Sequence, residues 1–209
     1  MRLEEARRDY YRKLAREQGY NSRAAYKLLE AVKKYGLVKP RNVVIDFGAA
    51  PGGWLQVASE AVGEGGLVVG VDLVKVSLPN ENVVSIQSDV KSPELVAILE
   101  RTLPRKADVV LSDLSPQVMG TWDLDHYRQV ELTFAATGLM DRFIRKRGNA
   151  MLKVFDGERF GEIRSELSKR FQVVHVMKPR ASRRASSELY LVCLGYSFEH
   201  PSTASSTSL

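Results

Sequence analysis

Short apolar, mostly β-branched runs alternate with segments of helical periodicity from residue 42 onward. Runs that are apolar throughout and alternate with helices predict a central, mainly parallel sheet covered on both faces. The helical segments lie near 53–61, 93–101, 125–147 and 158–170. The seven predicted strands are Val43–Phe47, Leu67–Asp72, Val83–Gln87, Asp108–Asp113, Ala150–Phe155, Phe171–Met177 and Glu188–Gly195.

The connection between the last two runs is short. Residues 178–187 leave no room for a helical crossover, so these two strands are expected to pair antiparallel. The whole pattern predicts a doubly wound α/β fold: a seven-stranded, mostly parallel sheet with a terminal antiparallel hairpin and helices on both faces.

Two helices are predicted before the first strand. Residues 1–18 show helical patterning with charges of both signs, and Asn21 or Ser22 is placed to cap the next helix. Lys27 lies on the opposite side of that helix from its apolar stripe, so its side chain is expected to point toward water or a ligand. The stripe consists of Ala25, Leu28, Leu29 and Val32.

Length and composition describe one ordinary globular domain. The chain has 209 residues, of which 44% are apolar and 27% charged, values that exclude a collagen-like or wholly disordered chain. We expect a single domain over 1–198 with a basic helical extension at 1–36, and a disordered Ser/Thr-rich tail at 199–209. Because no surplus apolar stripe is left over, we expect a monomer.

The expected location is the cytoplasm. No uncharged apolar run approaches the roughly 18 residues that a membrane span needs, so no membrane contact is expected. Cys193 is the one cysteine and is expected to be a small buried hydrophobe in a reduced protein. Three scattered histidines without cysteine partners predict no metal site.

Positive charge is concentrated in two places. The net charge is +6, and residues 1–34 hold ten Lys or Arg against five Asp or Glu. Residues 178–184 hold four bases and no acid. Such clusters favour contact with a polyanion, although solvated helix and loop surfaces would look the same. The candidate contact residues are Arg12, Arg16, Arg23, Lys34, Lys178, Arg180, Arg183 and Arg184.

A glycine-rich loop follows the first strand, in the sequence Asp46-Phe47-Gly48-Ala49-Ala50-Pro51-Gly52-Gly53-Trp54. Glycines at the carboxyl end of a central strand let the backbone approach a ligand closely. The spacing differs from the G-x-G-x-x-G of dinucleotide sites, and the absence of Gly-Lys-Ser/Thr excludes a P-loop. The loop alone is weak evidence of a ligand site.

Carboxylates follow the next three strands. Asp72 is placed to accept both ribose hydroxyls of a nucleoside. Asp89 with Val90 suits an adenine amine and ring, and Asp113 ends the fourth strand. Three acids beside a glycine loop favour a nucleoside that carries a positive charge, although each acid alone could cap a helix.

Five short sequence segments occur in the same order as the motifs of a known protein family. They are Gly19–Leu28, Asp46–Trp54, Ser112–Pro116, Lys153–Phe155 and Arg183–Tyr190. Over about residues 8–196 the chain resembles the FtsJ/RrmJ family of S-adenosylmethionine-dependent RNA ribose 2′-O-methyltransferases. The resemblance implies a Rossmann-like methyltransferase fold. Bacterial members have Met-Ala where this chain has Leu114-Ser115, outside the catalytic positions.

The resemblance also implies roles for particular residues. Its catalytic tetrad corresponds to Lys27, Asp113, Lys153 and Glu188. Its cofactor is S-adenosyl-L-methionine, with no metal. The implied cofactor contacts are Gly48, Ala49, Ala50, Pro51, Gly52, Gly53, Trp54, Asp72, Leu73, Asp89, Val90 and Asp113.

These residue types suit methyl transfer to a hydroxyl. Lys153 interrupts an otherwise apolar strand, and burial near another cation favours the neutral lysine that a general base needs. A Lys153 that stays charged would instead steady the developing alkoxide. Asp113 can bind the cofactor ammonium, and Glu188 can orient a lysine or the hydroxyl. The sequence leaves both roles of Lys153 open. Tyr26 and Tyr190 suit either stacking on bases or the core.

The resemblance implies a uridine in the A-loop of large-subunit ribosomal RNA as the target, within the ribosomal subunit. Methylation of the anticodon loop of tRNA is a close alternative. Amino methylation of a base is disfavoured, because the sequence Asp113–Pro116 lacks the second proline and the aromatic residue of the Asp/Asn-Pro-Pro-aromatic loop that such enzymes carry. A non-catalytic RNA-binding assembly factor and, least favoured, a nicotinamide dehydrogenase complete the alternatives.

Overall fold

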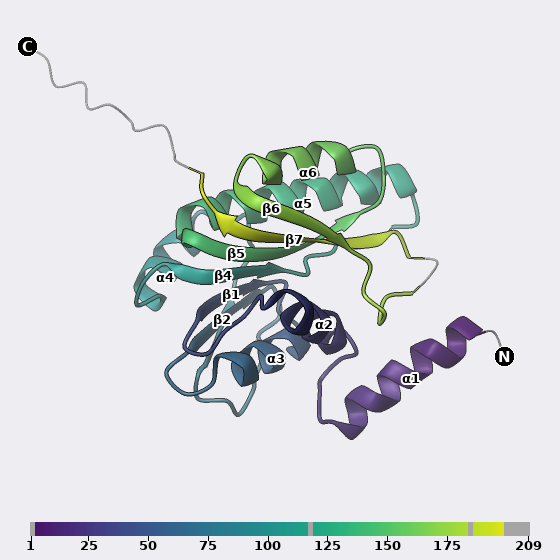
Figure 1. Cartoon of the computed structure of the whole chain (residues 1–209), viewed down its shortest axis with the longest axis horizontal. Coiled ribbons are helices and arrows are strands. Elements are labelled where there is room, and N and C mark those ends of the chain that lie inside the picture. Colours follow the sequence, from purple (N-terminus) through teal and green to yellow (C-terminus); the bar gives the residue numbers. More distant parts are fainter. Residues whose placement is uncertain (1–2, 117–118, 184–185, 199–209) are drawn as a thin grey trace, which may run out of the picture.

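A computed structural model describes residues 3–116, 119–183 and 186–198, and it contains one seven-stranded sheet (Figure 1). The strand order is β3-β2-β1-β4-β5-β7-β6. The neighbours from β3 to β5 pair parallel, whereas β7 pairs antiparallel to both β5 and β6. The strands are β1 (Val43–Phe47), β2 (Leu67–Asp72), β3 (Val83–Gln87), β4 (Ala107–Ser112), β5 (Ile144–Phe155), β6 (Phe171–Met177) and β7 (Glu188–Tyr196).

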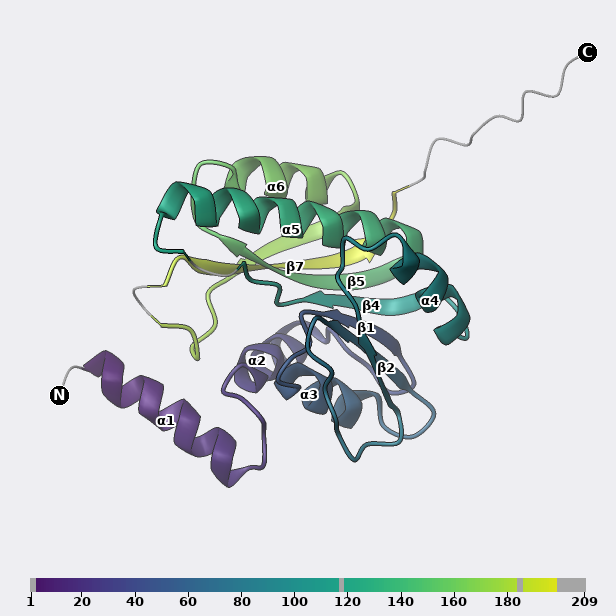
Figure 2. The same ribbon diagram turned by 180° about the vertical axis from the view of Figure 1, so that it is seen from behind.

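Helices cover both faces of this sheet, as the two opposite views show (Figures 1 and 2). One apolar cluster joins α2 and α3 to one face, and a second cluster joins α4, α5 and α6 to the other. The helices are α1 (Leu3–Glu17), α2 (Ala25–Tyr35), α3 (Gly53–Val62), α4 (Glu94–Thr102), α5 (Trp122–Phe143) and α6 (Phe160–Ser168). The predicted α/β architecture and the terminal antiparallel pair are therefore confirmed.

The first helix stands apart from the two helical layers (Figure 1). Its contact with α2 includes the rings of Tyr11 and Tyr26, whose centroids are 5.3 Å apart. Tyr26 Oη also donates a hydrogen bond to Gln18 just after α1. Among the described helices, none has the length and apolar character needed to cross a bilayer.

Two local predictions were wrong. The helix predicted to reach residue 147 ends at Phe143, and β5 starts at Ile144 instead of residue 150. The basic residues at 145–147 have good helix propensity, but Arg147 adopts a left-handed φ of 62° and Ile144 pairs with Ala107 on β4. Neither Asn21 nor Ser22 caps α2, whose N-cap is Ala24.

The central strands of the sheet form much of the buried apolar core. Every residue of β1 and β4 is buried, as expected for parallel strands covered on both faces. Cys193 on β7 is fully buried, and burial raises the pKa of its thiol. The prediction that Cys193 is a buried hydrophobe is confirmed.

One buried acid, Asp108, ties the amino-terminal edge of the sheet together. Its carboxylate accepts hydrogen bonds from the Val43 amide at 2.7 Å and from Arg145 Nε at 2.5 Å, and Arg105 Nη2 lies 2.7 Å away. Burial raises the pKa of Asp108, but the hydrogen bonds from Arg105, Val43 and Arg145 outweigh burial, so the pKa lies below its usual value.

We predict that Asp108→Ala lowers the free energy of unfolding at pH 7 by about 2–3 kcal/mol, because a buried amide and two guanidinium groups lose their acceptor. The folded-state pKa is below the unfolded one, so this stability is present above about pH 4 and lost as the pH falls through the folded pKa. Denaturant titrations at pH 7 and pH 3 should show the gap between parent and variant narrowing in acid. The exposed Glu64→Ala serves as a control; an equal loss in that variant would contradict the assignment.

Candidate active site

The carboxyl ends of β1 and β4 come unusually close together. Gly48 has a φ of 82°, and a Cβ built there would lie 2.9 Å from the amide nitrogen of Leu114. Gly52, the N-cap of α3, has a φ of 105°, and its Cβ would meet the Val76 side chain at 2.8 Å. Only glycine fits both the backbone conformation and the space at these two positions.

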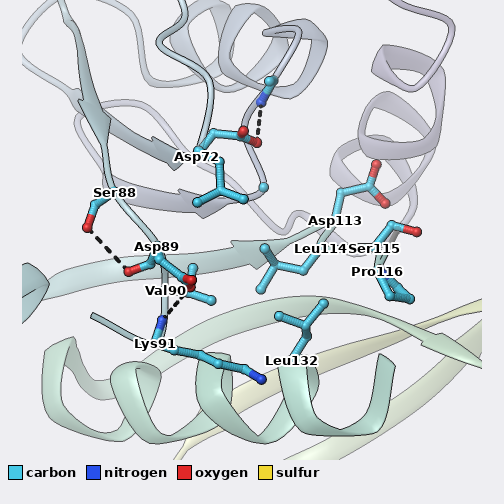
Figure 3. A pocket seen from close by; sticks show the side chains of 13 residues that line it. Asp72, Ser88, Asp89, Val90, Lys91, Asp113, Leu114, Ser115, Pro116 and Leu132 are labelled. Carbon is cyan, nitrogen blue, oxygen red and sulfur yellow. Dashed lines mark hydrogen bonds between the residues drawn. The ribbon is translucent and has the colours of Figure 1, made fainter. Parts of the chain in front are cut away.

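A cavity of about 470 Å³ opens beside this loop (Figure 3). Carboxylates of Asp72 and Asp113 lie on one side of it, and Leu132 of α5 faces it from the other side. Its lining combines three acids with apolar side chains and backbone. The lining residues are Gly48, Ala50, Asp72, Leu73, Ser88, Asp89, Val90, Lys91, Asp113, Leu114, Ser115, Pro116 and Leu132.

Backbone amides orient two of the three carboxylates. Asp72 Oδ2 accepts from the Ala50 amide at 3.0 Å, and Asp72 Oδ1 accepts from the Val74 amide at 2.9 Å. Asp89 Oδ1 accepts from the Lys91 amide at 2.8 Å. None of the three acids is a helix N-cap: α4, the next helix after Asp72 and Asp89, has Pro93 at that position, and α5, which follows Asp113, has Thr121. The interpretation of these acids as helix caps is therefore wrong.

A second, smaller hollow of about 200 Å³ adjoins the larger cavity. The two cavities share Gly48, Ala50 and Asp113 as lining. The remaining wall of the smaller hollow comes from the start of α2 and the glycine loop. It consists of Ser22, Arg23, Ala24, Lys27, Ala49, Pro51, Gly53 and Trp54.

Two buried lysines meet two acids beside this hollow. Lys27, 5% exposed, lies with its Nζ 3.2 Å from Glu188 Oε2 and donates to Tyr190 Oη at 2.8 Å. Lys153, 4% exposed, donates to the Asp113 carbonyl oxygen at 2.7 Å and lies 3.3 Å from Asp113 Oδ1. Each amine therefore has an acidic partner, which burial of a cation requires.

Tyr190 connects the two pairs. Its hydroxyl accepts from Lys27 and donates to Asp113 Oδ1 at 2.7 Å, so a continuous chain of contacts runs from Glu188 to Lys153. Burial, followed by the charges of Asp113 and Glu188, raises the pKa of Tyr190 well above its usual value, so the hydroxyl stays protonated.

From the sequence, Tyr190 was compatible either with the core or with stacking on a base. It is fully buried, and it is also part of the polar chain. The sequence did contain a sign that Tyr190 belongs to the site: Glu188 and Tyr190 are two residues apart on one strand, so their side chains lie on the same face. Tyr190 also pairs in register with Lys153 on β5. Trp54 packs its ring 5.8 Å from that of Tyr190 and donates to the Ala24 carbonyl oxygen.

A further acid lies behind the loop. Asp46 on β1 is fully buried, and neither carboxyl oxygen has a hydrogen-bond partner among the described residues. Burial, reinforced by the negative charges of Asp113 and Asp72, raises the pKa of Asp46 well above its usual value. The neutral acid is therefore favoured at this position.

The predicted site residues divide by position. Seven of the predicted cofactor residues line the larger cavity, namely Gly48, Ala50, Asp72, Leu73, Asp89, Val90 and Asp113. Ala49, Pro51, Gly53 and Trp54 line the smaller hollow, whereas Gly52 lines neither. Of the predicted tetrad, Lys27 and Asp113 line the hollow, and Lys153 and Glu188 lie one contact behind them. Lys27 is directed into the protein, not toward open water.

Sequence reasoning missed part of the larger cavity. Leu132 sits in the middle of a long helix, and its position at the cavity follows from tertiary packing alone. The cavity is also lined by Leu114, Ser115 and Pro116. They directly follow Asp113 at the carboxyl end of a strand, so their place beside a ligand site could have been predicted. In the described part of the chain, no group of His, Cys, Asp and Glu is arranged to hold a metal ion.

Most of the predicted polyanion-binding residues belong to α1 and to the loop after β6, whereas Lys34 lies in the last turn of α2. Arg12, Arg16, Lys34, Lys178, Arg180 and Arg183 are exposed, and Arg23 is half-buried at the wall of the smaller hollow. The Arg180 amide donates to Glu30 on α2, which holds the loop after β6 against that helix. Arg184 lies outside the described residues. Figure 1 places this loop and α1 on the same side of the sheet.

Comparison with known proteins gives the family. The profile of the FtsJ-like methyltransferase family matches residues 20–196. A protein of Cenarchaeum symbiosum, named ribosomal RNA large subunit methyltransferase E, is 48% identical over 196 residues, which cover 94% of this chain and 99% of that protein.

Solved structures agree on the fold. A proposed ribosomal RNA methyltransferase of Plasmodium falciparum is 32% identical, with a TM-score of 0.76 over 85% of this chain and 98% of that one. Fibrillarin of Aeropyrum pernix, solved with natively bound S-adenosyl-L-methionine, shares the fold at 16% identity, with a TM-score of 0.58 over 84% of this chain and 75% of that one.

The resemblance seen in the five sequence blocks is thus confirmed by the profile and by the relatives. The chain belongs to the FtsJ-like methyltransferase family.

Proposed function

We propose that this enzyme transfers a methyl group from S-adenosylmethionine to a ribose 2′-hydroxyl of RNA, at a uridine in the A-loop of large-subunit ribosomal RNA. The observation that carries the proposal is the buried chain Glu188, Lys27, Tyr190, Asp113 and Lys153 beside a small hollow that opens into an acidic cavity. A reaction that removes a proton from a weakly acidic hydroxyl needs such positioned acid–base groups.

The larger cavity fits the cofactor in shape and charge. Asp72 and Asp89 offer carboxylate oxygens to ribose hydroxyls and to an adenine amine, and Val90, Leu114 and Leu132 offer apolar contact to the ring. Asp113 suits the ammonium group, and the missing side chain at Gly48 lets the backbone of Asp113 and Leu114 lie directly against the glycine loop. When bound there, S-adenosylmethionine would supply a methyl group activated by a sulfonium.

The polar chain would prepare the hydroxyl. Lys27 and Asp113 both line the smaller hollow, so both reach a ribose placed in it. Lys153 touches Asp113 from behind and would act either as a neutral base through this contact or as a fixed cation that stabilises the alkoxide. Glu188 and Tyr190 would hold the Lys27 amine in place.

RNA is the substrate class that the surroundings favour. Exposed cations occur on α1 and on the loop after β6, which lie on the same side of the sheet, and Arg23 lines the hollow itself. Phosphate contacts of this kind position a nucleic acid without reading its sequence. The relatives' name, ribosomal RNA large subunit methyltransferase E, supports ribosomal RNA over tRNA.

We predict that Lys153→Ala lowers the rate of methyl transfer by at least about 100-fold, because general-base or electrostatic groups contribute about 10²–10⁴. The affinity for S-adenosylmethionine should change by less than about threefold, since Lys153 does not line the larger cavity. Single-turnover rates with labelled cofactor, together with calorimetric titration, measure both. Lys169→Ala, just after α6, is the control. An unchanged rate in Lys153→Ala would contradict a catalytic role for Lys153, whereas a parent chain that transfers no methyl group would favour the non-catalytic RNA-binding factor.

We predict that Asp72→Ala weakens S-adenosylmethionine binding by about 10–100-fold, because a carboxylate hydrogen bond to ligand hydroxyls contributes about 1.5–3 kcal/mol. Calorimetric titration gives this dissociation constant. Asp123→Ala, an exposed acid outside both cavities, is the control. The parent chain should not bind NAD in the same assay, and tight NAD binding would revive the dehydrogenase alternative.

The target is tested by incubating the enzyme and labelled cofactor with large ribosomal subunits and with tRNA, each prepared without its natural methylation. Digestion of the product to nucleosides should release labelled 2′-O-methyluridine from the large-subunit RNA, and primer extension should place it in the A-loop. Label in the anticodon loop of tRNA would move the assignment to that branch of the family. Label on a base amine would contradict ribose methylation altogether.

A further inference from the structure

A second basic surface lies at the amino-terminal edge of the sheet, opposite the candidate active site. It is formed where three chain segments meet before β1, before β4 and at the start of β5. We call these residues the amino-edge patch, and all of them are exposed: Lys39, Arg41, Arg105, Lys106, Arg145, Lys146 and Arg147.

Side-chain contacts bring the three segments together. Arg105 Nη2 donates to the Arg41 carbonyl oxygen at 3.2 Å and lies 2.7 Å from Asp108 Oδ2. Arg145 binds the other oxygen of Asp108. The segments 39–41, 105–108 and 145–147 contain seven cations and this one acid, a surplus of six positive charges in one place.

Four of these cations take part in no ion pair within the described residues. Within the described residues no carboxylate pairs with Lys39, Arg41, Lys106 or Arg147, whereas Asp108 already serves the packing of Arg105 and Arg145. Like charges held this close repel one another and disfavour the compact state. A surface with such an excess of cations over acids therefore suits a polyanionic partner.

The backbone supplies an independent observation. Arg41 and Arg147 have φ values of 63° and 62°, and they are the non-glycine residues with positive φ in the described part of the chain. This conformation costs about 1–2 kcal/mol for most residues and is far easier for glycine or asparagine. Strained backbone of this kind clusters at functional sites, and here both strained residues carry a cation of the patch.

The composition of the patch favours RNA over a protein partner. Protein interfaces rely on buried aromatic and apolar anchors. None of the exposed large hydrophobic residues falls in the three segments; they are Tyr10, Leu73, Val74, Val84, Met119, Leu124, Tyr127, Val173 and Val176. Phosphate backbone needs only cations, and it gains from releasing counterions.

We propose that the amino-edge patch is a second contact for the phosphate backbone of a large folded RNA. β4, with six residues, runs from the patch to Asp113 and spans about 20 Å at 3.3 Å per residue. A short hairpin seated at the active site does not extend around the domain to the patch, whereas a folded ribosomal RNA does. The inference rests on the proposed function, which makes RNA the substrate.

The test is the double variant Lys106→Gln with Arg147→Asn, which removes two charges and gives residue 147 a side chain tolerant of left-handed backbone. Its matched control is Arg164→Gln on α6 with Lys169→Gln just after that helix, which removes the same charge from another exposed surface. The probes are a large-subunit ribosomal RNA transcript and an A-loop hairpin of about 20 nucleotides. Dissociation constants are measured between 50 and 200 mM salt.

For the transcript, the patch variant should bind about tenfold more weakly, and the slope of log affinity against log salt should fall by about 1 to 2. Hairpin affinity should stay within about twofold, and the control variant should match the parent with both probes. Thermal unfolding shows whether each variant is folded.

The outcomes separate the two proposals. If the parent binds the transcript and the patch variant keeps its affinity and salt slope, the amino-edge patch is not an RNA contact. If the parent binds neither RNA, the proposed function itself fails, and the patch proposal with it.

Discussion

The burial of two lysine amines is the constraint on which the site depends. A buried ammonium is tolerated only when partners replace the water it loses. Lys27 and Lys153 come from the first helical layer and from the fifth strand, and Asp113 and Tyr190 link them across β4 and β7. Satisfying these charges requires that α2, β4, β5 and β7 be brought into register, so local charge balance and the global fold support each other.

The fold was predictable because its signals are local. Apolar strands of five to eight residues, separated by amphipathic helices, allow few arrangements other than a covered parallel sheet. The end of α5 was not predictable, because Arg145, Lys146 and Arg147 favour a helix, whereas pairing with β4 and the left-handed backbone at Arg147 end it.

The site residues that stand at the ends of strands were predictable from their order along the chain. Gly48, Asp72, Asp89 and Asp113 all follow strands, and parallel strands bring their carboxyl ends to one edge. Contacts made by packing gave no such signal: Leu132 on α5 faces the cavity only because of how that helix lies on the sheet. The convergence of 39–41, 105–106 and 145–147 likewise depends on strand order, which composition along the chain does not reveal.

The wall common to the two cavities has a thermodynamic consequence. Gly48, Ala50 and Asp113 belong to both, so a molecule occupying one cavity forms part of the boundary of the other. If a molecule in one cavity changes the affinity for a molecule in the other, the second molecule changes the affinity for the first by the same factor. Under the proposed function, such a change would link the exchange of spent cofactor to the release of modified RNA, with Asp113 in the wall between them.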